Sequence, residues 1–75
     1  MTNELLLREK IKESGYKIYY VAERAGLTYQ GFLNKLSNER EFVASEIQAL
    51  TDLLHLSLEE QQQIFFACNV EKSST

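Results

Sequence analysis

The chain has 75 residues, of which 44% are apolar and 25% are charged, and its formal net charge is −3. A chain of this length forms one small domain, and its composition is typical of a globular protein rather than a disordered one. No run approaches the roughly 20 apolar residues of a membrane-spanning helix. The first ten residues also lack the basic-then-apolar order of a signal peptide, so we expect a cytoplasmic location.

Residues suited to metal binding or catalysis are scarce. Cys68 is the only cysteine and His55 the only histidine, which excludes an internal disulfide and falls short of a structural zinc site. The acidic residues are spread along the chain, and no phosphate-binding loop or nucleophile motif accompanies them. We therefore expect no metal, no cofactor, no small-molecule substrate and no enzymatic activity.

Apolar residues recur three and four positions apart, which predicts an all-α fold of five helices. The expected helices cover residues 3–14, 17–25, 28–36 or 37, 44–54 and 58–67. Thr2 or Asn3 can cap the first helix and Gly15 ends it. Ser57 and Glu60 form a capping box at the start of the last helix.

We expect residues 1–68 to form one domain and residues 69–75 a loose tail. The inward side of each helix follows from the spacing of its apolar residues. The expected core comprises Leu7 and Ile11 with Leu5 or Leu6, then Ile18, Val21, Ala22, Ala25, Phe32, Leu36, Ile47, Leu50, Leu53 and Leu54.

The most informative segment is residues 18–38. Ala22, a small residue, stands four positions before Gly26, which can adopt the left-handed backbone conformation of a turn. Thr28 can then cap a second helix with its hydroxyl, and Phe32 and Leu36 lie on one face of that helix. Two short helices that cross closely at a steep angle need these residue types.

This segment resembles the helix-turn-helix of the Cro and CI repressors of phages and mobile elements. The matching positions are Ala22, Gly26, Leu27, Thr28 and Phe32, and the resemblance extends over residues 5–66. It implies a compact five-helix repressor-like domain with the helix-turn-helix at its second and third helices. The implied partner is a double-stranded DNA operator, whose major groove the third helix would enter.

Two positions depart from the pattern of this family. Lys35 stands where an apolar residue is usual, so that Leu36 would have to make the apolar contact, and Tyr29 stands where a small or polar residue is common.

Charge is distributed unevenly along the chain. Residues 8–40 hold seven basic and four acidic side chains, a balance of +3, whereas residues 41–75 hold one basic and six acidic side chains, a balance of −5. DNA affinity depends on the charge of the surface that faces the DNA. The positive half contains the expected helix-turn-helix, although +3 implies few phosphate contacts.

Candidate DNA-contacting residues follow from the face of the third helix opposite Phe32 and Leu36. Gln30 and Asn34 carry carboxamides, which can donate and accept at an adenine edge. Tyr29 can meet a thymine methyl or a phosphate, or cover the edge of the core, and Leu33 can meet a thymine methyl or a protein. Lys17, Tyr19, Lys35 and Arg40 are candidates for phosphate contacts. The full expected set is Lys17, Tyr19, Thr28, Tyr29, Gln30, Leu33, Asn34, Lys35 and Arg40.

Ile64, Phe65 and Phe66 are three consecutive large apolar residues on the last expected helix. Consecutive helix positions point over a wide arc, so at least one should face outward and contact a second copy or a partner repressor. A fully internal cluster is the alternative. The low basic charge and Leu33 also keep open a different function, a protein-binding helix-turn-helix module that acts as an antirepressor or antitoxin.

Overall fold

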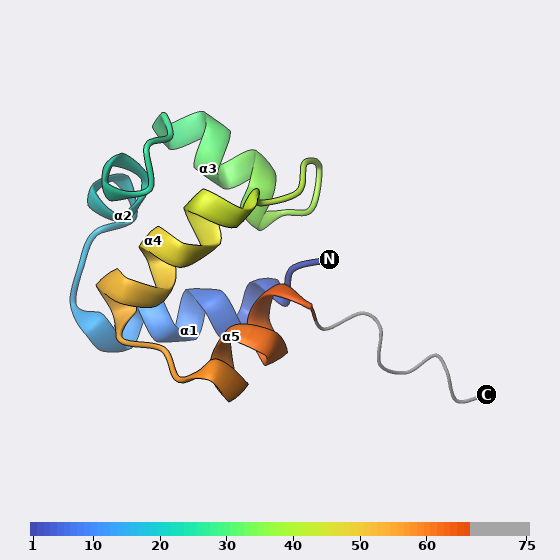
Figure 1. The fold of residues 1–75 in the computed structure, drawn as a ribbon. Helices are drawn as coiled ribbons and strands as arrows, with labels where there is room; N and C mark the ends of the chain where they lie inside the picture. The colour runs from blue at the N-terminus through green and yellow to red at the C-terminus, as the bar shows by residue number, and fades with distance from the viewer. Residues whose placement is uncertain (67–75) are drawn as a thin grey trace.

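The computed structural model describes residues 1–66, which form five α-helices and no strand (Figure 1). The helices are α1 (Glu4–Ser14), α2 (Ile18–Arg24), α3 (Tyr29–Leu36), α4 (Ala44–Leu54) and α5 (Leu58–Phe65). The all-α prediction is therefore confirmed for this part of the chain. The last helix ends two residues earlier than expected, and Cys68 and the expected tail lie outside the described residues.

The predicted capping residues take their expected roles. The Asn3 side chain accepts a hydrogen bond from the Leu6 amide at 3.1 Å, and Gly15 follows α1 with a φ of 83°. The Thr28 hydroxyl accepts from the Gly31 amide at 3.0 Å. Because these bonds satisfy amides that a helix leaves unpaired, the helix starts are set locally.

Helix α4 lies at the centre of the fold. It contacts α1, α2 and α5, while α2 also packs on α3 and α1 on α5. In Figure 1, α4 runs between the α2–α3 pair on one side and α1 with α5 on the other. This arrangement leaves α3 at the end of the molecule away from α1 and α5, and Tyr29 and Gln30 in its first turn are exposed.

The core confirms most of the expected inward residues, includes Ile64 and Phe65 of α5, and adds two residues that lie outside the helices. Leu7, Val21, Phe32, Leu36 and Leu50 are fully buried. Leu6, Ile18, Ile47, Leu53 and Leu54 are partly buried against the core, while Leu5 is exposed. The two additions are Phe42 and Leu56, which lie in the segments between helices and were not predicted to be buried.

Phe42 joins parts of the chain that are distant in sequence. Its ring centroid lies 5.8 Å from that of Phe32 on α3 and 5.4 Å from that of Phe65 on α5, both in edge-to-face geometry. Such aromatic pairs add about 0.5–1.5 kcal/mol each beyond the area they bury. The connector between α3 and α4 is thus part of the core.

The N-terminal residues are also fixed by this connector. The Thr2 amide donates to Asn38 Oδ1 at 2.8 Å, and Asn38 Nδ2 donates to the Thr2 carbonyl at 2.9 Å. Asn38 has a φ of 72°, a left-handed conformation that Asn adopts more readily than most residues. The chain before α1 is therefore tied to the segment that follows α3.

The turn between α2 and α3 depends on Gly26. Its φ is 82°, as the sequence predicts. The Gly26 amide donates to the Glu23 carbonyl at 3.0 Å, and the Leu27 amide donates to the Ala22 carbonyl at 2.9 Å. This is the Schellman arrangement that ends a helix and redirects the chain.

We predict that Gly26→Val lowers the free energy of unfolding by more than about 1 kcal/mol, because a β-branched residue resists positive φ. No atom lies within 4 Å of a Cβ placed at Gly26, so the cost is conformational rather than steric. Gly26→Asn is the matched control and should cost much less. Thermal and urea unfolding followed by circular dichroism measure both variants, and equal stability of Gly26→Val and wild type would contradict the assigned turn.

Candidate functional site

The candidate site is the outer face of α3, opposite its buried side. Phe32 and Leu36 are fully buried, whereas Gln30 is exposed and Tyr29 keeps 52% of its surface exposed. Leu33 is half-buried and packs against the core. Leu33 is therefore less exposed than Tyr29 and Gln30, because part of its side chain packs against the core.

Gln30 and Asn34 lie together on this face. The Gln30 amide nitrogen donates to Asn34 Oδ1 at 3.0 Å. Gln30 is the second residue of α3 and Asn34 lies four positions further, a spacing that places side chains one above the other on a helix. The two candidate base readers therefore form one hydrogen-bonded pair.

Of the candidate phosphate contacts, Lys17, Tyr19 and Arg40 are exposed. Lys17 immediately precedes α2, and Tyr19 lies in its first turn. Arg40 follows α3, and its backbone amide donates to the Asn34 carbonyl at 3.3 Å. The backbone of Arg40 thus lies close to that of Asn34, whereas Lys17 and Tyr19 lie at the start of α2.

Lys35 has a partner within the chain. Its Nζ lies 2.7 Å from Glu46 Oε1, and the two side chains are only 15% and 12% exposed. The same oxygen accepts from the Val43 amide at 3.0 Å, at the start of α4. Lys35 therefore links the end of α3 to the start of α4, which explains how a lysine is accommodated where the resembling family has an apolar residue.

Thr28 and Gly31 constrain the start of α3. Besides capping the helix, the Thr28 hydroxyl lies 2.9 Å from the position that a Cβ on Gly31 would take. A side chain at Gly31 would press on the oxygen that caps the helix. Glycine at this helical position is therefore compatible with the cap, although it is a poor helix former.

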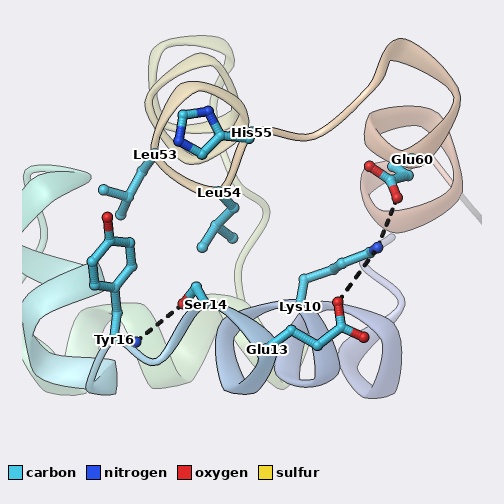
Figure 2. A pocket seen from close by; sticks show the side chains of 8 residues that line it. All are labelled: Lys10, Glu13, Ser14, Tyr16, Leu53, Leu54, His55 and Glu60. Atoms are coloured by element: carbon cyan, nitrogen blue, oxygen red, sulfur yellow. Dashed lines mark hydrogen bonds and ion pairs between the residues drawn. The ribbon is translucent and has the colours of Figure 1, made fainter.

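A second feature is a cavity of about 330 Å³ between the ends of α1 and α4 and the start of α5 (Figure 2). Its lining includes Lys10, Glu13, Tyr16, His55 and Glu60. Figure 2 shows Lys10 between two carboxylates, and its Nζ lies 2.7 Å from Glu60 and 3.8 Å from Glu13. The lysine charge is thus compensated within the cavity.

Among residues 1–66, no three or more His, Cys, Asp or Glu side chains are placed to hold a metal ion. The contact between Lys10 and Glu60 instead joins α1 to α5. The hydrogen bond with Glu60 raises the pKa of Lys10, and the hydrogen bond from Lys10 lowers the pKa of Glu60.

Comparison of the chain with protein-family models, with curated proteins and with solved structures finds no match in any of the three. Within the described part of the chain, every helix is too short or too polar to cross a membrane.

We predict that Glu60→Gln lowers the melting temperature at neutral pH. Glutamine can keep the capping box with Ser57, so the substitution removes mainly the ion pair with Lys10. The pKa of Glu60 lies below its ordinary value of 4.5 in the folded state, so its contribution is present above that pH and is lost as the pH falls. The pKa of Lys10 lies above 10.5, so its contribution is lost only as the pH rises beyond that value.

The difference in melting temperature between wild type and Glu60→Gln should therefore be largest at intermediate pH and shrink in strong acid and strong base. Glu59→Gln is the control, since Glu59 is exposed and in the same first turn of α5 but does not contact Lys10. A pH-independent difference would show that the ion pair does not contribute to stability.

Proposed function

We propose that this protein is a sequence-specific DNA-binding transcriptional regulator, similar to Cro-type repressors, in which α2 and α3 form a helix-turn-helix. The observation that carries the proposal is the construction of α3. Its apolar side is fully buried at Phe32 and Leu36, its start is capped by Thr28, and its outer side carries the Gln30–Asn34 pair. A rigid helix with carboxamides near its N-terminus suits the major groove of DNA.

The distribution of charge supports the same orientation. The charge balance is +3 over residues 8–40 and −5 over residues 41–75. The half that contains α2 and α3 should therefore be attracted to the negatively charged DNA backbone more strongly than the other half. Lys17 and Arg40 are exposed and are proposed phosphate contacts, together with Tyr19. Lys35 is left out of this set because Glu46 already holds its ammonium group.

The end of α5 supports association with a second copy or a partner repressor. Ile64 and Phe65 are buried, but Phe66 keeps 49% of its surface exposed, so one of the three apolar side chains faces outward. Burying the exposed part of the Phe66 side chain against another subunit would stabilise the association by about 1 kcal/mol. Regulators of the resembling family bind paired half-sites as dimers, so we propose that Phe66 lies in the contact between subunits.

A second candidate function is a protein-binding helix-turn-helix module that acts on a partner regulator as an antirepressor or antitoxin. The observation that favours it is the balance of −5 over residues 41–75 combined with the exposed Phe66. A gel-shift assay on the neighbouring intergenic DNA, with and without the adjacent regulator, separates the two functions. A DNA-binding regulator shifts the DNA alone, whereas an antirepressor removes the shift caused by its partner.

Gln30→Ala should weaken binding to a selected operator by about 1–3 kcal/mol and leave binding to random DNA nearly unchanged, because base contacts carry sequence information and phosphate contacts do not. Fluorescence anisotropy with both DNAs at one salt concentration measures this. Gln62→Ala, an exposed glutamine on α5, is the matched control. Equal weakening on both DNAs would exclude Gln30 as a base reader.

Phe65→Ser and Phe66→Ser should separate folding from association. Phe65 is buried and contacts Phe42, so its loss should lower the melting temperature and cost about 3 kcal/mol or more. Phe66→Ser should instead leave the melting temperature of the monomer nearly unchanged and weaken self-association and operator binding together. Sedimentation equilibrium and anisotropy test this, and a wild-type chain that stays monomeric at high concentration and on the operator would contradict the proposed dimer.

A further inference from the structure

We propose that Asn38 is a positioning residue that acts through residues 2 and 3. These two residues form a strap between the turn that ends α3 and the last turn of α5. The docked strap holds both of the proposed surfaces in place, the outer face of α3 and the contact at Phe66. The inference rests on the proposed function, since it concerns the same two surfaces, and it adds that one side chain outside both surfaces controls them together.

The strap is bonded to α5 at a carbonyl that the helix leaves free. The Asn3 amide donates to the Ile64 carbonyl at 2.6 Å. Ile64 is the second-last residue of α5, and the last four carbonyls of a helix have no partner within the helix. Phe66 follows two positions later and keeps 49% of its surface exposed. The strap therefore fixes the backbone directly before the proposed association residue.

The other end of the strap is held by one side chain. Asn38 Oδ1 accepts from the Thr2 amide at 2.8 Å, and Asn38 Nδ2 donates to the Thr2 carbonyl at 2.9 Å. Thr2 is only 5% exposed and is the one buried polar residue among residues 1–66. Buried backbone groups that lose their partners are costly, so without Asn38 the strap should leave as a unit. The strap thus has two states, docked and released.

Asn38 is also part of the turn that ends α3. Its amide donates to the Lys35 carbonyl at 3.2 Å, and the Glu39 amide donates to the Asn34 carbonyl at 2.9 Å. The backbone of Asn38 is left-handed, with a φ of 72°, so the turn determines where the carboxamide lies. The turn and the docked strap therefore stabilise each other.

Release of the strap should disturb both surfaces at once. At one end, the Ile64 carbonyl loses its bond to Asn3, and the last turn of α5, directly before Phe66, is free to fray. At the other end, the turn after α3 loses an anchor, and Arg40, a proposed phosphate contact, follows that turn. A second copy at Phe66 and DNA at α3 should therefore both bind the docked state better than the released state.

Asn38→Gly isolates the contact with Thr2, because glycine adopts the left-handed conformation readily but has no side chain. His55→Gly is the matched control, since His55 is the other non-glycine residue with positive φ within residues 1–66 and it ends α4. Asn38→Asp keeps the acceptor and the backbone preference but loses the donor. Its effects should be intermediate, and it replaces Asn38→Gly if that variant does not fold.

The first measurement is amide hydrogen exchange by NMR in the dilute full chain, at a temperature at which circular dichroism shows each variant folded. Asn38→Gly should lower the protection of the Asn3 amide by about tenfold or more, because the side chain that keeps the strap docked is lost. The Glu39 amide should lose protection as well, whereas His55→Gly should change neither. An Asn3 amide that stays equally protected in Asn38→Gly would overturn the inference.

The second measurement separates positioning from a general loss of stability. Sedimentation equilibrium and anisotropy with a selected half-site duplex should show that Asn38→Gly weakens self-association and half-site binding by about tenfold each. In this variant, saturating duplex should restore most of the lost self-association, because both binding events select the docked strap. In wild type and His55→Gly, in which the strap is already docked, the duplex should change self-association by less than about twofold.

Loss of only one of the two affinities in Asn38→Gly, or no restoration by the duplex, would contradict the role of Asn38. A strictly monomeric wild type would overturn the inference together with the proposed dimer. A wild type that binds no DNA would contradict the proposed regulator, whereas the exchange result and the loss of self-association would still decide whether Asn38 acts through the strap. The two failures are therefore distinguishable.

Discussion

The contact on which the rest of this structure depends is the aromatic row of Phe32, Phe42 and Phe65. It joins α3 to α5 through a residue that lies in the connector between α3 and α4. The main helix–helix contact of α3 is with α2, so Phe42 supplies its link to α5. The row therefore fixes how far α3 stands from the α1–α5 end of the molecule and which of its faces remains outside.

Polar contacts at the two ends of α3 also restrict the position of this helix. Thr28 caps its start, and Lys35 near its end pairs with Glu46 at the start of α4. Just beyond the helix, Asn38 holds the backbone of Thr2. A half-buried ion pair is weak evidence for stability by itself, but its geometry restricts the orientation of the helix. A helix that reads DNA needs this restriction, because base contacts tolerate little displacement.

The proposed function uses the surface that these contacts leave free. The chain as a whole is acidic, so its net charge alone argues against a DNA partner. DNA binding is compatible with this net charge because the basic residues are concentrated in the half of the chain that contains α2 and α3. Phosphate contacts should be few, and a larger share of affinity should come from base contacts and from association through α5. This division fits a regulator whose activity follows its concentration.

The sequence by itself determined the features that depend on neighbouring residues. The five helices, the caps at Asn3, Thr28 and Ser57, and the left-handed turn at Gly26 all follow from local hydrogen bonding and backbone sterics. The burial of Phe32 and Leu36 follows from helical periodicity. These interactions span at most a few residues, so their signals lie within short windows of sequence.

Only the tertiary structure decided which distant side chains meet. It gave Lys35 a carboxylate partner on α4, packed part of Leu33 against the core, and left Phe66 rather than Ile64 or Phe65 exposed. It also buried Phe42 and Leu56, whose positions outside helices carry no periodic signal. These outcomes depend on how helices cross and how connectors fold back over them. A local pattern does not contain that information, because the energy of such contacts comes from residues far apart in the chain.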